Sequence, residues 1–181
     1  MGLSIHYRGN IKNEKLIDPL IEEVKDICES LDWEYDVFDD DTFKGISFAP
    51  NDCEPVFLTF NKIKQLSSPI LYQYDIEPAT IISVKTQFAG TDAHIAIINL
   101  FRYLENLYFD NFHMDDEGNY WESGDEAALQ LQFKKYNTFL NLVENTLKEM
   151  KEVPGETKES LVFRINAIIQ KKMNDLKYPT K

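Results

Sequence analysis

The strongest constraint on the fold is a run of apolar residues at helical spacing, which directly follows a segment where apolar and polar residues alternate. Apolar and polar residues alternate from Leu3 to Tyr7, which predicts a half-buried strand ending near Gly9 and Asn10. Apolar residues then recur at helical spacing. They are Leu16, Ile17, Leu20, Val24, Ile27, Cys28 and Leu31. Because a helix with a single apolar face must bury it against another element, this region predicts a helix packed on a sheet.

Short runs of strand-forming residues follow the helix. They lie at residues 33–38, 45–48, 55–61, 70–74 and 80–88. Asp, Asn, Pro and Ser separate these runs, and connections this short favour antiparallel neighbours. We therefore expect an α+β fold with a mostly antiparallel sheet of about five to six strands and helices packed on one face.

The second half of the chain predicts helices. One begins at Thr91 or Asp92, either of which can cap it, and runs to Tyr108. An acidic segment around Gly118 predicts a tight hairpin or loop. Residues 125–151 carry a coiled-coil-like seam, and residues 161–176 predict a shorter helix that folds back antiparallel. We expect an α+β body over residues 1–124 and a helical segment over residues 125–181 packed on it, which together form one structural domain.

The charge of the chain is acidic and unevenly distributed. The sequence holds 31 acidic and 19 basic residues, and the excess lies in the first 124 residues, because residues 125–181 carry 10 basic and 8 acidic groups. Such a field repels phosphate backbones and anionic headgroups, so we expect neither nucleic-acid nor membrane binding. The expected partners are basic proteins or small ligands.

Motifs that mark location and chemistry are absent from the sequence. No basic segment precedes a long apolar run near the start, and Cys28 and Cys53 have no disulfide or metal-site spacing, which indicates a reduced, cytoplasmic protein. Glycine-rich nucleotide loops, the His-Glu-x-x-His motif, paired Cys-x-x-Cys motifs and the Gly-x-Ser-x-Gly elbow are all missing. We therefore expect no cofactor, and these absences favour a protein that is not an enzyme.

The polar side of the predicted sheet holds the best candidate for a binding site. In each strand, the residues that alternate with the apolar ones face away from the core. These candidates are His6, Arg8, Thr59, Lys85 and Gln87. In an acidic body, three of them (His6, Arg8 and Lys85) would form a positive patch that suits an anionic ligand. The alternative is that they are solvated residues paired with neighbouring carboxylates.

Two further segments contain candidate ligand-binding residues. His94 follows a strand-to-helix junction, where the positive end of a helix favours an anion; the alternative is a hydrogen-bonded core histidine. The acidic segment contributes Glu117, Trp121 and Glu122 as candidates. Its spacing departs from that of calcium loops, so we expect no metal there, and a solvated turn with Trp121 as a packed anchor is the alternative.

Three segments carry a resemblance to known proteins. They read GLSIHYRG at residues 2–9, TQFAG followed by HIAI within residues 86–97, and DEGNYW at residues 116–121. Together they resemble an uncharacterised family of bacterial proteins of unknown function, over roughly residues 1–145. The resemblance implies a bacterial origin and no activity, cofactor or partner.

Two hypotheses about function follow. The first is a non-enzymatic interaction protein that binds a basic protein partner, similar to an immunity protein or an antitoxin by analogy of charge only. The second is a protein that binds a small anionic ligand, or a hydrolase, using the polar sheet face. In it, Arg8 and Lys85 would orient the anion, His6 would carry the proton, and Glu117 or Glu122 would act as base or metal ligand. The seam of residues 129–150 packs within the chain or forms a homodimer, so both monomer and homodimer remain open.

Overall fold

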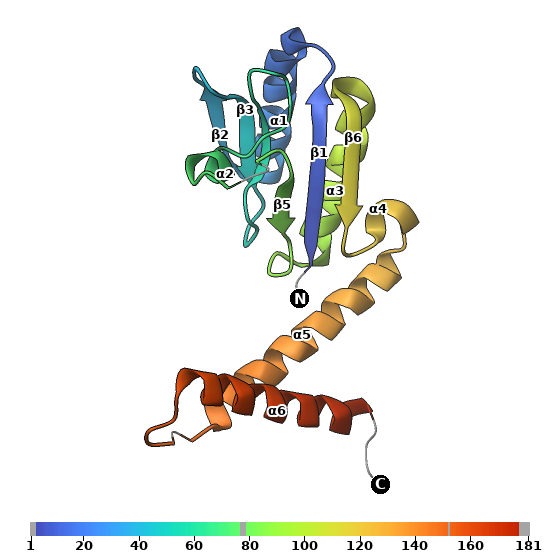
Figure 1. Cartoon of the computed structure of the whole chain (residues 1–181). Helices are drawn as coiled ribbons and strands as arrows, with labels where there is room; N and C mark the ends of the chain where they lie inside the picture. The colour runs from blue at the N-terminus through green and yellow to red at the C-terminus, as the bar shows by residue number, and fades with distance from the viewer. Residues whose placement is uncertain (1–2, 77–78, 152, 178–181) are drawn as a thin grey trace. The chain divides into compact units, whose positions relative to one another are not determined.

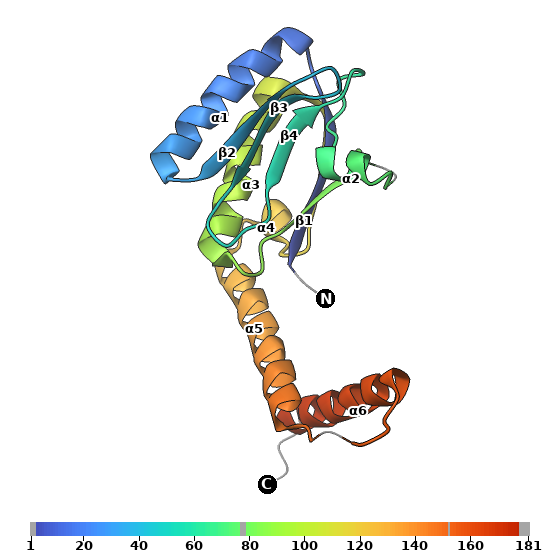
Figure 2. The same cartoon turned by 90° about the vertical axis from the view of Figure 1, so that its left-hand side faces the viewer.

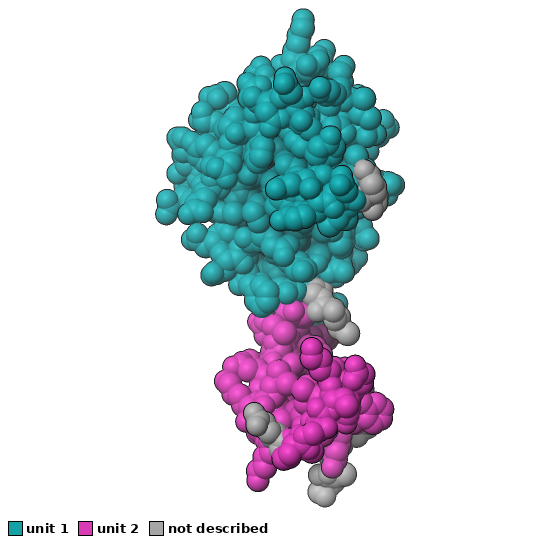
Figure 3. Space-filling view, turned by 60° about the vertical axis from the view of Figure 1, so that its left-hand side comes forward, with its two compact units in different colours: residues 1–133 teal, residues 134–181 magenta. Residues whose placement is uncertain are grey.

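The computed structural model describes residues 3–76, 79–151 and 153–177, and it divides into two compact units, residues 1–133 and residues 134–181 (Figure 3). Gly2, the first residue of the segments that carry the family resemblance, lies outside the described residues. None of the helices within the described ranges is long and apolar enough to cross a membrane.

The first unit contains two antiparallel sheets of three strands each (Figure 1). One has the order β5-β1-β6, with β5 at Ile82–Lys85, β1 at Ser4–Ile11 and β6 at Phe109–Asp116. The other has the order β2-β3-β4, with β2 at Glu34–Asp39, β3 at Lys44–Ala49 and β4 at Val56–Phe60. The predicted α+β class is confirmed, whereas the prediction of one sheet with five to six strands is wrong.

The two sheets are joined through β1 and β4. The amide of Leu66 donates to the carbonyl of Gly9, and the amide of Ser67 donates to the carbonyl of Thr59, both at 2.9 Å. The buried hydroxyl of Tyr7 also donates to the carbonyl of Phe57 and accepts from its amide, each at 2.9 Å. The segment at residues 66–67 and the side chain of Tyr7 therefore provide hydrogen-bond partners for backbone groups of β1 and β4 that would otherwise lie unpaired between the two sheets.

Helices α1 (Ile17–Leu31) and α3 (Gly90–Tyr108) lie on the same side of the strands, as Figure 2 shows. Helix α1 packs on β2 and β3 and ends at Asp32, which adopts a left-handed conformation, so the predicted helix is confirmed. Helix α3 packs against β6, and Phe101 contacts the ring of Tyr7 with 4.6 Å between centroids. The main core lies between these helices and the strands.

Two local predictions are wrong, and a third holds only in part. Residues 70–74 lie in helix α2 (Pro69–Gln73), where Ser68 caps the amide of Leu71 and Pro69 occupies the first turn. Helix α3 starts at Gly90 without a side-chain cap from Thr91 or Asp92. Of the two alternatives for the acidic segment, the hairpin is wrong, because a turn at residues 117–118 connects the end of β6 to the short helix α4 (Tyr120–Ser123).

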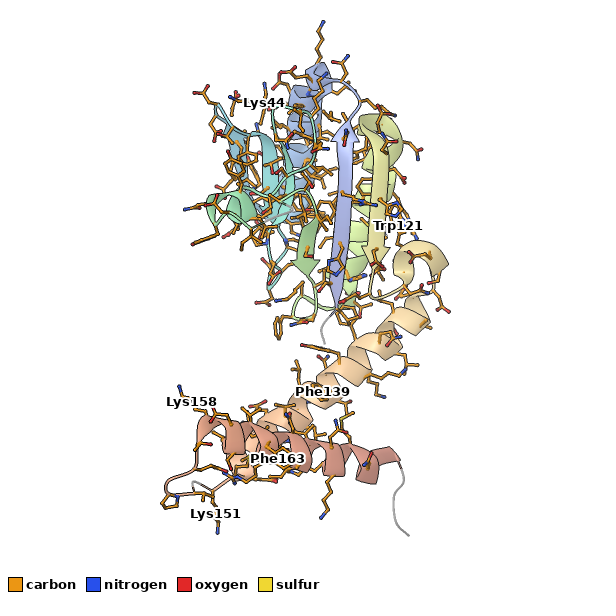
Figure 4. All side chains as sticks on the ribbon, viewed as in Figure 1. Lys44, Trp121, Phe139, Lys151, Lys158 and Phe163 are labelled. Carbon is orange, nitrogen blue, oxygen red and sulfur yellow. The ribbon has the colours of Figure 1, made fainter. Side chains whose placement is uncertain are left out.

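The remaining elements are two long helices, α5 (Glu126–Glu149) and α6 (Lys158–Lys177). The first turns of α5 belong to the first unit, where Leu129 and Phe133 are buried. In the second unit, Lys172 of α6 pairs with Glu149 at 2.6 Å, so α6 passes the C-terminal end of α5. Phe163 is 77% exposed on α6 (Figure 4).

Candidate functional site

The structure brings three of the predicted residues together on one sheet. Strand β1 pairs with β5 and β6, so that His6 lies opposite both Ser83 and Asp115, and Ser4 lies opposite Lys85. Because Tyr7 faces α3, its neighbours His6 and Arg8 face the other side of the sheet. This surface, the open face, therefore carries His6, Arg8 and Lys85 as the alternation of the sequence predicts.

Carboxylates lie near two of the three side chains that the open face presents. The Nε2 atom of His6 lies 3.8 Å from Glu117, and the same Glu117 accepts a hydrogen bond of 2.8 Å from the amide of Ser4. The ammonium of Lys85 lies 3.7 Å from Glu54. These exposed pairs reduce the local positive charge, as expected for a solvated sheet face.

The open face contains a serine, a histidine and a carboxylate in a row. The Nδ1 atom of His6 lies 2.5 Å from the hydroxyl of Ser83, and Glu117 stands on the other side of the ring. Nucleophilic catalysis uses these groups when the carboxylate holds the imidazole by a hydrogen bond. At 3.8 Å, Glu117 is beyond hydrogen-bonding distance, so it does not orient the ring of His6.

Arg8 lies at a hollow on the same face. The hollow has a volume of about 310 Å³ and lies where β1, β6 and the segments around residues 65 and 80 meet. Its polar side chains come from Arg8, Asn10, Gln65, Thr80 and Asn111. Asn111 has a positive φ of 51° at an irregularity between β1 and β6, where the register shifts between Arg8 and Asn10. Such bulges re-aim side chains at sheet margins.

Four predicted residues take no part in the open face as the sequence suggested. Thr59 is fully buried and donates to the carbonyl of Ser67 at 2.6 Å, because both faces of β4 are covered. Gln87 accepts from the amide of Leu3 in the turn after β5.

Trp121 lies on α4 beside β6 (Figure 4), where it packs against the core and its carbonyl accepts from Arg102. Glu122 is exposed on the same short helix.

His94 is a core histidine. Its Nδ1 atom lies 2.7 Å from the hydroxyl of Thr86, and its Nε2 atom lies 3.0 Å from Oδ1 of Asp116, although the ring is not aligned for a straight bond there. Asp116 also accepts from the amides of Gly118, Tyr120 and Trp121. This buried network fixes the turn after β6 and is closed to solvent, as the alternative of a hydrogen-bonded core histidine predicts.

A second surface is the outer edge of β2, which we call the acidic edge and define by Glu34, Asp36, Val37 and Asp39. All four side chains are exposed. Within the described ranges, β2 pairs only with β3, and Figure 1 shows it at the margin of the strands. Its outer backbone groups are therefore open to another strand.

The sequence does not predict the polar residues that surround Arg8 in the hollow. Asn10, Gln65, Thr80 and Asn111 are ordinary turn and strand residues in the sequence, and only the pairing of distant segments gathers them around Arg8. Among the described residues, no group of three or more His, Cys, Asp or Glu side chains is arranged to hold a metal ion. Comparison of the chain with models of protein families, with curated proteins and with solved structures finds no match.

Proposed function

We propose that this chain is an interaction protein that binds a basic, extended segment of a partner protein at the acidic edge. The observation that carries the proposal is an edge strand whose outer side is unpaired in the described structure and whose exposed side chains include Glu34, Asp36 and Asp39. An extended segment added beside β2 would complete the backbone hydrogen bonds of the edge.

The charge of the first unit supports a basic partner. Residues 1–133 carry 25 acidic and 9 basic groups, so the field around the unit attracts cations and speeds their encounter. Val37 is 50% exposed and offers apolar contact on the opposite face of β2 from Glu34 and Asp36. Because strand side chains alternate between faces, Glu34 and Asp36 point to one face of β2 and Val37 to the other. A segment that alternates basic and apolar residues therefore places its basic side chains beside Glu34 and Asp36 and its apolar side chains beside Val37.

Charged edge strands also prevent self-association, and that role is compatible with the proposal. Carboxylates on β2 repel a second copy of a chain whose net charge is −12. The same carboxylates attract a lysine-rich or arginine-rich strand. The acidic edge thus selects against self-pairing and for a basic partner.

A defined peptide tests the proposal. A ten-residue peptide of alternating Lys and Val is titrated into the full chain, and the backbone amide signals of β2 are followed by NMR, with an alternating Glu and Val peptide as the control. We expect the basic peptide to shift the β2 signals at low salt and to bind about tenfold more weakly at 0.3 M salt, because salt screens exposed charge pairs.

Two triple variants distinguish binding at the acidic edge from attraction by the overall negative charge of the first unit. The variant Glu34→Gln, Asp36→Asn, Asp39→Asn removes three charges from β2, whereas Asp26→Asn, Asp110→Asn, Glu122→Gln removes three exposed charges elsewhere in the first unit. The edge variant should weaken peptide binding by about tenfold, since three ion pairs are lost. Equal weakening by both variants, or no shift of the β2 signals, would refute the proposal.

A further inference from the structure

The hollow at Arg8 is a further surface with a specific chemistry, and its charge is positive whereas that of the acidic edge is negative. Four segments contribute to it: the end of β1, the irregular part of β6, the segment around Gln65 that follows β4 and the segment that precedes β5. Arg8 and Asn111 are exposed, while Asn10, Gln65 and Thr80 are half-buried in its wall. The hollow is therefore open to solvent on one side and lined by polar groups on the other.

Arg8 differs from the other two arginines of the chain. Arg102 donates to the carbonyls of Tyr120 and Trp121, and Arg164 forms an ion pair with Glu156 at 2.6 Å. In the part of the chain that the structure describes, the guanidinium of Arg8 makes no hydrogen bond or ion pair. A guanidinium offers five donors in a planar fork that matches carboxylate and phosphate oxygens.

The other polar side chains of the hollow supply further donors. Three carboxamides (Asn10, Gln65 and Asn111) and one hydroxyl (Thr80) lie in its wall, and no other described residue engages these side chains in a hydrogen bond. The described residues that line the hollow include no Asp or Glu, in contrast to the surroundings of His6 and Lys85. Neutral donors around one cation favour a ligand with several acceptor oxygens.

We propose that the hollow at Arg8 binds a small oxyanion group, a carboxylate or a phosphate, through the fork of the Arg8 guanidinium and the carboxamides of Asn10, Gln65 and Asn111. Ile81 provides the apolar part of the wall, which accommodates a short carbon stem attached to the oxyanion. The site lies apart from β2, so it does not depend on the proposed binding of a basic partner.

Inorganic phosphate and acetate serve as the probes, each titrated against sodium chloride of equal ionic strength. The NMR signals of the side-chain amides of Asn10, Gln65 and Asn111 report on the hollow directly. We expect saturable shifts of these signals by at least one of the two anions at about 1–50 mM, the range of a single exposed charge-assisted contact. Which anion saturates the signals decides between a phosphate and a carboxylate ligand.

Three variants separate a built site from diffuse attraction. Arg8→Gln should weaken binding by at least about tenfold, and Arg8→Lys, which keeps the charge but loses the fork, should weaken it by about threefold to fivefold. Lys62→Gln removes one exposed positive charge that does not line the hollow and should change binding by less than about twofold. Unchanged amide spectra outside the hollow establish that the variants are folded.

Two results would overturn the proposal. The first is the absence of saturable shifts of the three carboxamide signals with both anions up to about 50 mM in the unaltered protein, a test that needs no variant. The second is an equal loss of binding in Arg8→Gln and Lys62→Gln, which would show that only the summed charge of the surface attracts the anion.

Discussion

The Nε2 atom of His94 lies 3.0 Å from Oδ1 of Asp116, and both side chains are fully buried. This contact joins the start of α3 to the end of β6, and three backbone amides after β6 complete the environment of the carboxylate. Burial alone would raise the pKa of Asp116, but His94 and the amides of Trp121 and Gly118 outweigh it and lower the pKa below the ordinary value of 3.8.

The first prediction concerns acid stability. Because the folded-state pKa of Asp116 is below its unfolded value, its ionised form stabilises the fold fully above pH 3.8, and this contribution is lost as the pH falls through the lower folded-state pKa. Asp116→Asn should lower the free energy of unfolding by about 2–4 kcal/mol at pH 7 and flatten its dependence on pH below 3.8. Urea unfolding between pH 2.5 and 7 measures both effects. Asp110→Asn, an exposed control, should leave the curve unchanged.

Regular periodicity made part of the fold predictable. Helix α1 follows from its stripe, and β1 follows from strict alternation. Strand β6 was not predicted, because its bulge spaces Phe109, Phe112 and Met114 by three and two residues and so interrupts the two-residue alternation typical of a strand. The run 70–74 is rich in strand formers, yet the Ser68 cap and Pro69 favour the first turn of a helix.

The second prediction concerns the junction of the two sheets. Tyr7→Phe removes the hydroxyl that bonds both the amide and the carbonyl of Phe57, and it leaves two buried backbone groups without partners. The free energy of unfolding should fall by about 2–3 kcal/mol. Tyr35→Phe is the matched control, since the hydroxyl of Tyr35 bonds only the exposed carboxylate of Glu29, and it should cost less than about 1 kcal/mol in urea unfolding. Equal losses would show that the Tyr7 hydroxyl does not hold the sheets together.

Only the part of the candidate site that depends on the alternation of side chains along strands could be predicted from the sequence. His6, Arg8 and Lys85 share a face because alternate residues of paired antiparallel strands do so. Glu54 and Glu117, which accompany Lys85 and His6, come from turns whose positions depend on long-range packing. Thr59 alternates with the apolar residues of β4, a pattern that indicates a surface position. Both faces of β4 are covered, however, so the alternation could not predict that Thr59 is buried.

The third prediction concerns the two free cysteines. Burial raises the pKa of Cys28 to about 11, and burial together with the nearby charge of Glu54 raises the pKa of Cys53 to about 11. Since the thiolate is the reactive form, both thiols should react with iodoacetamide at pH 7.5 at least about 100-fold more slowly in the folded protein than in guanidinium chloride. Mass spectrometry of timed samples measures the rates. Rapid alkylation of folded Cys53 would contradict its raised pKa.

The fourth prediction tests the pairing of β3 and β4. Gly45 has a φ of 152°, and a Cβ atom there would lie 2.2 Å from the carbonyl oxygen of Leu58 and 2.7 Å from the Cα atom of Thr59. These atoms belong to the backbone of the adjacent strand and cannot rotate away, so Gly45→Ala must separate β3 from β4 and should lower the free energy of unfolding by about 3 kcal/mol or more. Gly9→Ala is a graded comparison, because its Cβ would meet Phe112 at 3.2 Å and needs only a small shift. A Gly45 variant as stable in urea as the Gly9 variant would mean that the two strands are not this closely paired.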